Sequence, residues 1–218
     1  EVLKFYPERF FKKGFPEHNE RSVPEKTIAH LIKELPAFPE HLQLMYLILF
    51  CTGIRKSEVC TIKSGAFYSQ GNENWMRIYQ SKMRREKVIP VPSLLVGLVN
   101  DYEKKYGIKN GEYLFKNKKG GAFNGQTFSN QMIRECKARG IACGDYIFRA
   151  HDYRHNLATS MYGNGVSIQG VRDYLGHSSE NMTKQYIDFM PERIVSAEDK
   201  YFSKNQSFKL KGAEDDER

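Results

Sequence analysis

The chain has 218 residues, of which 40% are hydrophobic, so it can bury one sizeable core with a small appendage at most. Its net charge of +8 favours a polyanionic partner, nucleic acid before an anionic membrane surface. The most apolar stretch, residues 42–50, is too short to span a bilayer, and the sequence has neither a Walker loop nor a GxGxxG fingerprint, which argues against a membrane protein and a nucleotide site.

The N-terminal part of the chain predicts a linker followed by three helices. Residues 1–20 show little periodicity, and the chain begins without a Met, so we expect them to connect to something upstream. A first helix is expected from the N-cap Ser22 to Pro36, a second over about 39–51, and a third after the break "TG" at 52–53. The apolar face of the first helix is expected to carry Ile28, Leu31, Ile32 and Leu35.

The rest of the chain predicts a hairpin and then helices. Residues 75–80 and 87–91 have the composition of strands and are joined by the polar segment "SKMRRE". The fold class is therefore mainly α with a small antiparallel β-sheet (α+β). The helices that follow are expected at about 93–105, 126–139, 151–162, 167–175 and 180–190.

The cysteines do not predict a metal site. None of them forms a CxxC pair, and the spacings within the two pairs are nine and seven residues, which argues against a zinc ribbon. We expect inert thiols in a reducing compartment. The four residues are Cys51, Cys60, Cys136 and Cys143.

Arg55 is a candidate phosphate ligand. It follows a turn at the start of a helix, where backbone N–H groups favour an anion and a guanidinium can bind two phosphate oxygens. Glu58, three residues on, can hold that guanidinium in place. On these residues alone, a solvated surface ion pair is the better interpretation.

The segment "HDYRHNLAT" (151–159) contains a second candidate group. His151 and Arg154 are one helical turn apart, so both project from one face near a helix start. His155, four residues from His151, raises the alternative of a metal pair, although zinc needs a third ligand and no HExxH pattern is present. A structural His151 is a further alternative. The buried side of this helix is expected to carry Tyr153, Leu157 and Met161.

Two further segments are ambiguous when taken singly. The hairpin clusters basic residues that either touch DNA phosphates or place one lysine in an active site. In 175–187, His177 and Tyr186 are nine positions apart, and Tyr186 is either a core aromatic or a nucleophile. The basic residues of the hairpin are Lys82, Arg84, Arg85 and Lys87.

Taken together, these segments resemble the catalytic domain of the tyrosine recombinases, the phage integrase family, over about residues 22–195. "LFCTGIRKSEV" (49–59) is similar to the first arginine box, and "SKMRREKVIPVP" (81–92) to the lysine box of the hairpin. "HDYRHNLAT" is similar to the His-x-x-Arg box, and "LGHSS" (175–179) precedes a tyrosine at the family's spacing. Ser81 and Met83 stand where the family usually has glycines, which leaves Lys82, Arg84 and Arg85 open as the catalytic cation.

The resemblance implies a division of roles. Tyr186 is the nucleophile, and its pKa near ~10 requires a positive field and a base. Arg55 and Arg154 stabilise the charge that builds on phosphorus oxygens, with Glu58 supporting Arg55. His151 accepts a proton, and His177 hydrogen-bonds the phosphate. Lys82 protonates the leaving 5′-oxygen, while Arg84, Arg85 and Lys87 bind DNA.

The resemblance also implies what surrounds the chain. We expect a DNA recombinase or integrase of a mobile element that needs no cofactor, metal or ATP and acts on double-stranded DNA at specific sites, as a tetramer, in the bacterial cytoplasm. The expected domains are 1–20 as a linker from an absent N-terminal DNA-binding domain, 21–200 as the catalytic domain and 201–218 as a tail. The alternatives are a type IB topoisomerase-like or telomere-resolving enzyme, and a DNA-binding regulator without catalysis.

Overall fold

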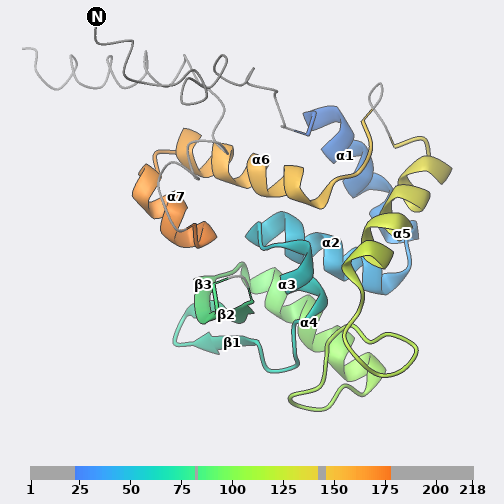
Figure 1. The fold of residues 1–218 in the computed structure, drawn as a ribbon, viewed down its shortest axis with the longest axis horizontal. Coiled ribbons are helices and arrows are strands. Elements are labelled where there is room, and N and C mark those ends of the chain that lie inside the picture. Colours follow the sequence, from blue (N-terminus) through green and yellow to red (C-terminus); the bar gives the residue numbers. More distant parts are fainter. Residues whose placement is uncertain (1–22, 82, 142–145, 178–218) are drawn as a thin grey trace, which may run out of the picture.

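A computed structural model describes residues 23–81, 83–141 and 146–177 of the chain (Figure 1). Within them the fold is mainly helical and contains one small three-stranded antiparallel sheet, which confirms the expected α+β class. Among these residues, no helix combines the length and the apolar character that a membrane crossing requires. The expected linker at 1–20, the helix at 180–190 and the tail at 201–218 lie outside the described residues.

Helix α2 (Glu40–Thr52) is the centre of the fold, with α6 on one side and the sheet and α4 on the other (Figure 1). Its sequence "EHLQLMYLILFCT" is apolar around most of its circumference, as is typical of a helix surrounded by other elements. It ends at Gly53, whose φ of 59° is a left-handed conformation that favours glycine. Helix α3 (Lys56–Cys60) starts three residues later, so the chain turns sharply at the predicted break.

The first helix differs from its prediction at both ends and on its apolar face. Helix α1 (Glu25–Glu34) has Pro24 rather than Ser22 as its N-cap, and a short 3₁₀ turn, η3 (Leu35–Ala37), follows it. Leu31 is fully buried, whereas Ile32 is 44% exposed. The two residues are about 100° apart around the helix, so a narrow buried face cannot include both. The buried Thr27, four residues before Leu31, completes that face instead.

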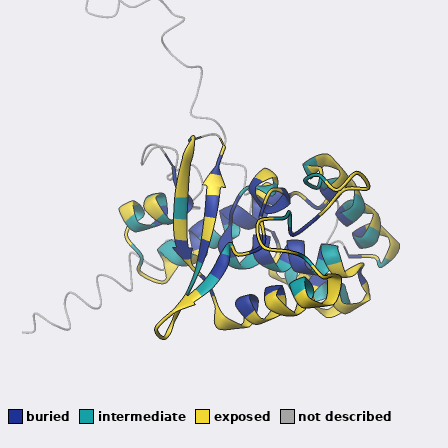
Figure 2. Cartoon of the chain, turned by 90° about the horizontal axis from the view of Figure 1, so that it is seen from below, coloured by how far each residue is buried: buried dark blue, intermediate teal, exposed yellow. Residues whose placement is uncertain are grey.

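The sheet has one strand more than the sequence predicted. Strand β1 (Phe67–Gln70) pairs with β2 (Glu73–Gln80), which pairs with β3 (Arg85–Pro90), all antiparallel. β1 has four residues, of which one is buried, so its sequence carries almost no alternation. The alternation is clear on β2, where buried and exposed residues follow one another toward the turn (Figure 2). Its buried side chains Met76, Ile78 and Gln80 face the helices.

Within the described residues, four helices follow the sheet at positions close to those predicted. They are α4 (Ser93–Tyr106), α5 (Gly125–Ala138), α6 (Ala150–Gly163) and α7 (Ile168–Leu175). Asn124 caps α5 by accepting hydrogen bonds from the N–H groups of Gln126 and Thr127, and the Ser167 hydroxyl caps α7. These side-chain caps account for the agreement at the N-termini of α5 and α7.

Two apolar clusters stabilise the described part of the chain. The large one surrounds α2 and includes Tyr153 of α6, whose ring meets that of Tyr46 edge-on at 5.2 Å. The small one joins α6 to α7 and has three fully buried members, with Leu157 and Met161 half-buried beside them. Tyr153 is therefore a core residue, as predicted, whereas Leu157 and Met161 belong to the second cluster. The fully buried members of that cluster are Ala158, Val171 and Leu175.

The described cysteines are free thiols. Burial raises the pKa of Cys60 and of Cys136 to about 11, so both are protonated and unreactive near neutral pH. This agrees with the inert thiols that the sequence predicted at these two positions. Cys143 lies outside the described residues.

Candidate active site

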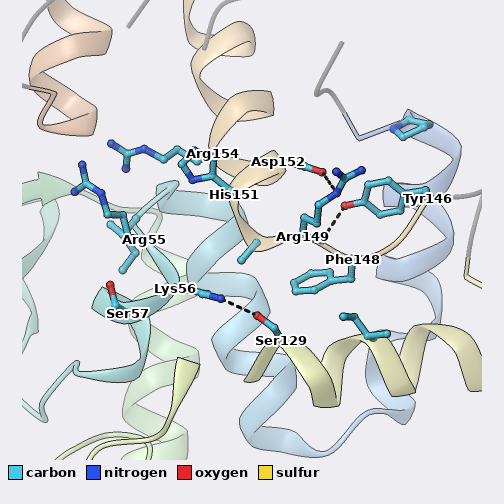
Figure 3. Close-up of a pocket in the computed structure, with 14 residues that line it drawn as sticks. Arg55, Lys56, Ser57, Ser129, Tyr146, Phe148, Arg149, His151, Asp152 and Arg154 are labelled. Atoms are coloured by element: carbon cyan, nitrogen blue, oxygen red, sulfur yellow. Dashed lines mark hydrogen bonds and ion pairs between the residues drawn. The ribbon is translucent and has the colours of Figure 1, made fainter. Parts of the chain in front are cut away.

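A cavity of about 1040 Å³ lies where the start of α3 meets the start of α6. Arg55, His151 and Arg154 all line it, although about a hundred residues separate the first from the other two. Figure 3 shows the guanidinium groups of Arg55 and Arg154 extending toward the same side, with the His151 ring beside Arg154. The structure thus brings together three of the residues that the sequence singled out.

Glu58 holds Arg55 from two directions. One carboxylate oxygen accepts a hydrogen bond from the Arg55 guanidinium at 2.9 Å, and the other accepts from the backbone N–H of Arg55 at 2.8 Å. The Glu58 side chain is 2% exposed and that of Arg55 is 19% exposed, so the carboxylate is buried beneath a partly open guanidinium. This is not the solvated surface pair that the isolated residues favoured. The arrangement fixes a cation at the edge of the cavity.

Arg154 is held by main-chain carbonyls. It is 1% exposed, and its two terminal nitrogens donate to the carbonyl of Gly53 at 2.7 Å and to that of Leu175 at 2.6 Å. Those carbonyls lie at the C-terminal ends of α2 and α7, where the helix dipoles favour a positive charge. The buried guanidinium therefore joins the ends of two helices beside the cavity.

The two histidines of α6 occupy different environments. His151 is exposed at the cavity, whereas His155, one turn further on, is buried. Their ring centroids are 6.2 Å apart. Within residues 23–81, 83–141 and 146–177, no group of three His, Cys, Asp or Glu side chains that could hold a metal ion is present. The described residues thus give the metal alternative no third ligand.

His177 is buried directly after α7. Its backbone N–H donates to the carbonyl of Arg172 at 3.0 Å, and its side chain is almost fully enclosed. Burial, followed by the charges of Arg154 and Arg55, lowers the pKa of His177 to about 3. The imidazole is therefore neutral at physiological pH and lies within electrostatic reach of both arginines.

The basic residues of the hairpin do not share one environment. Arg84 and Arg85 are exposed, and Arg84 has a φ of 50° in the turn. Lys87 is half-buried, and its Nζ donates a hydrogen bond to the carbonyl of Tyr174 in α7. Burial, followed by the charge of Arg154, lowers the pKa of Lys87 to about 7. Lys82 lies outside the described residues.

Sequence reasoning missed other residues around the cavity. Lys56 lines it and donates a hydrogen bond to the Ser129 hydroxyl of α5 at 3.4 Å (Figure 3). Arg149, at the start of α6, forms an ion pair of 3.3 Å with Asp152. Lys56 could have been found because it directly follows Arg55. Ser129 and Arg149 carry no comparable signal, since their place at the cavity depends on how α5 and α6 are arranged.

Tyr186 also lies outside the described residues. Its role as nucleophile, like that of Lys82 as acid, therefore stays a prediction. The described site supplies the two arginines, a carboxylate that fixes one of them, and two histidines. Such a set can bind a phosphate and stabilise additional negative charge on its oxygens.

The family model and the similar proteins found by comparison agree on one family. The model of the Phage integrase family matches residues 21–193. Transposase B from transposon PsiTn554 of Staphylococcus aureus is 30% identical over 208 residues, a match that covers 93% of this chain and 33% of the relative. The chain thus spans about a third of that relative's length.

Two solved structures show the same fold. The XerH site-specific recombinase bound to difH substrate, in a pre-cleavage complex, aligns with a TM-score of 0.65 and 20% identity, covering 83% of this chain and 54% of that one. A lambda integrase tetramer bound to a Holliday junction aligns with a TM-score of 0.57 and 22% identity, covering 77% and 48%.

Proposed function

The chain belongs to the phage integrase family, and we propose that it is a tyrosine recombinase that cleaves and rejoins DNA strands through a 3′-phosphotyrosyl intermediate. The observation that carries this proposal is the convergence of Arg55, His151 and Arg154 on one cavity, with His177 within electrostatic reach of both arginines. Family membership alone would not require these four residue types to be retained and brought together.

The arrangement suits phosphoryl transfer. Attack on a phosphodiester builds negative charge on the non-bridging oxygens, and fixed cations stabilise that charge because they need no reorganisation during the reaction. Arg55 is fixed by Glu58, and Arg154 is fixed by two carbonyls. Both guanidinium groups are therefore pre-positioned at the edge of a cavity wide enough to admit a phosphate.

The remaining roles complete the reaction. Tyr186 attacks the phosphorus, and His151, exposed at the cavity, takes up the tyrosine proton. Neutral His177 offers a hydrogen bond to the phosphate. Lys82 delivers a proton to the leaving 5′-oxygen. The bond energy is conserved in the phosphotyrosyl link, so the strand can be rejoined without ATP.

The proposed partner is double-stranded DNA carrying specific recombination sites, and the proposed assembly is a tetramer on that DNA in the bacterial cytoplasm. The net charge of +8 suits such a partner. The solved neighbours include a DNA-bound recombinase and a DNA-bound integrase tetramer, and a curated relative is a transposase. We further propose that 21–200 form the catalytic domain, with 1–20 as a linker and 201–218 as a tail.

A covalent-capture experiment tests the proposed function. A pool of nicked suicide duplexes with randomised sequence would be incubated with the chain, and denaturing electrophoresis would separate covalent adducts. We expect an adduct with the wild type, also in the presence of EDTA, and none with Tyr186→Phe. DNA binding by that variant should be nearly unchanged, since one oxygen is removed. An adduct with the variant would assign the nucleophile elsewhere, and loss of the wild-type adduct in EDTA would support the metal alternative.

A further inference from the structure

The C-terminal turn of α7 is held by two cations from other elements. Lys87 of β3 donates to the carbonyl of Tyr174, and Arg154 of α6 donates to the next carbonyl, that of Leu175. The Lys87 ammonium also lies 5.4 Å from the centroid of the Tyr174 ring. Both cations meet the negative end of the helix dipole, which favours their positive charge. His177 is two residues beyond Leu175.

A second contact joins the hairpin to the same turn. Gly176 has a φ of 69°, and a Cβ built on it would lie 2.6 Å from the side-chain amide of Gln80. Gln80 of β2 is buried, and its partner across the hairpin is Arg85. The inner face of the hairpin thus lies directly against the residue that precedes His177. Two independent contacts therefore place the hairpin on this turn.

These polar contacts contribute much of what fixes the position of α7. Within the described residues, the apolar cluster between α6 and α7 has only three fully buried members. A short helix with so little apolar burial depends on its end contacts for a fixed position. Lys87 lies opposite Ile78 in the register of the hairpin, on the face that turns inward. Its side chain is therefore placed to contact α7.

We propose that Lys87 is a positioning residue for the cleavage reaction: it fixes the C-terminal turn of α7 and, through it, holds His177 against Arg154 and Arg55. This inference rests on the proposed function and assigns Lys87 a role apart from the DNA contacts of the exposed Arg84 and Arg85. Other charged groups that face Lys87 are Glu58 from α3, Arg85 from its own strand, and Asp173 from α7.

The charge of Lys87 should control this role. Burial and the neighbouring arginines lower its pKa to about 7, so the ammonium loses its proton as the pH rises through that value. The neutral amine has no charge to interact with the end of α7. The wild type should therefore cleave DNA faster than a variant without the amine, and this difference in cleavage rate should be largest below pH 7 and decrease above it. An arginine at this position keeps its charge throughout.

The test compares Lys87→Met with Lys87→Arg, and Lys104→Met, at an exposed position of α4, serves as the matched control. We expect Lys87→Met to slow single-turnover cleavage at saturating DNA by about 10–100-fold, the loss typical of a small misplacement, with less than about 3-fold change in Kd. Lys87→Arg should restore most of the rate and remove the decline above pH 7. Lys104→Met should behave as the wild type. A raised Kd with an unchanged rate at saturation would make Lys87 a DNA contact and overturn the proposal.

A substrate with a 5′-bridging sulfur separates positioning from acid catalysis. Sulfur leaves without a proton, so it should rescue Lys82→Ala if Lys82 is the acid. It should not rescue Lys87→Met, because a displaced His177 slows cleavage with either leaving group. Rescue of Lys87→Met would instead make Lys87 the acid and overturn its positioning role.

An NMR measurement decides the proposal independently of cleavage. The full chain would be labelled with 13C in its histidine rings, and the His177 signal would be assigned by its loss in His177→Gln. That signal should be single and narrow in the wild type and in Lys87→Arg. It should shift and broaden in Lys87→Met. An unchanged signal would overturn the proposal. If the wild type formed no DNA adduct, the proposed function would fail, while this spectrum would still decide the role of Lys87.

Discussion

The two halves of the site rest on different supports. Arg55 and Glu58 begin α3, which adjoins the large apolar cluster around α2, and a buried carboxylate holds the cation. Arg154 and His177 lie where α6 meets α7, beside an apolar cluster with three fully buried members, and hydrogen bonds to carbonyls hold the cation. The first half lies on the large apolar cluster, whereas the α7 side of the second half has little apolar burial and depends on polar contacts between elements.

This difference indicates which half responds to its surroundings. Segments with few buried apolar contacts open at the lowest free-energy cost, so α7 and His177 should be displaced more easily than α3. His177 is also the described residue closest in sequence to Tyr186. The half of the site that leads to the proposed nucleophile is therefore the less strongly supported one.

The largest expected effect is on the two arginines, which should differ in their contribution to stability. Arg55→Ala and Arg154→Ala should each slow DNA cleavage by about 10²–10³-fold, the loss of a transition-state donor. Arg154→Ala should lower the free energy of unfolding more, on the order of 3 kcal/mol, because it leaves two buried carbonyls without their donor. Arg55→Ala should lower it less, because the Glu58 carboxylate that loses its cation still accepts the backbone N–H of residue 55. Cleavage rates and urea unfolding of both variants would measure this, and equal loss of stability would contradict the comparison.

A pair of glycines tests the contact between the hairpin and α7. Gly176→Ala should destabilise the chain by about 2–3 kcal/mol, because it adds a collision with Gln80 to the strain of a positive φ. Gly107→Ala is the matched control, since Gly107 also ends a helix with a φ of 60° but has nothing within 4 Å of its built Cβ. It should cost about 1 kcal/mol. Equal unfolding free energies for the two variants would show that the hairpin does not limit this position.

The pH dependence of stability reports on the buried histidine. Unfolded His177 binds a proton near pH 6.5, whereas the folded form does so only near pH 3. Between these values the unfolded state binds more protons, so the contribution of His177 is complete above pH 6.5 and is lost as the pH falls toward 3. The free energy of unfolding should change with pH by at most about 1.4 kcal/mol per pH unit through this group. Urea unfolding from pH 7 to 4 would show it, and His177→Gln should have a shallower slope if the assignment is correct.

The smallest expected effect is that of an exposed hairpin arginine. Arg84→Ala should weaken DNA binding a few-fold and reduce the salt dependence of log K by about 1, as expected for one lost phosphate contact. Binding titrations at several salt concentrations would measure this. They should detect the loss of Arg84, whereas Lys87→Met should change Kd little. No change in the salt slope would remove Arg84 from the proposed DNA surface.

Local sequence patterns predicted most of the described elements but not the contacts between them. The spacing of Arg55 and Glu58 was sufficient to predict their pairing, because both belong to one helical turn. The partners of Arg154 could not be predicted, since Gly53 and Leu175 approach it only through the arrangement of α2, α6 and α7. Strand β1 was missed because four residues with one buried side chain give no periodic signal.

Lys87 shows a further limit. In the sequence it is one of several cations near a turn. The register places both Lys87 and Arg85 on the inward face, opposite the buried Ile78 and Gln80, yet Lys87 is half-buried against α7 whereas Arg85, at the start of β3, is exposed. Composition and spacing contain no such distinction. The local sequence thus identified the chemistry, whereas the packing of the hairpin against α7 determined which cation contacts that helix.

The central claim, that Tyr186 is the nucleophile, is tested most directly by locating the DNA link. Covalent complex formed on suicide DNA would be digested with nuclease and trypsin, and the peptides analysed by mass spectrometry. We predict a nucleotide on the peptide 185–193, which contains Tyr186 as its single tyrosine. A nucleotide on 173–184, which contains Tyr174, or on 201–204, which contains Tyr201, would contradict the account.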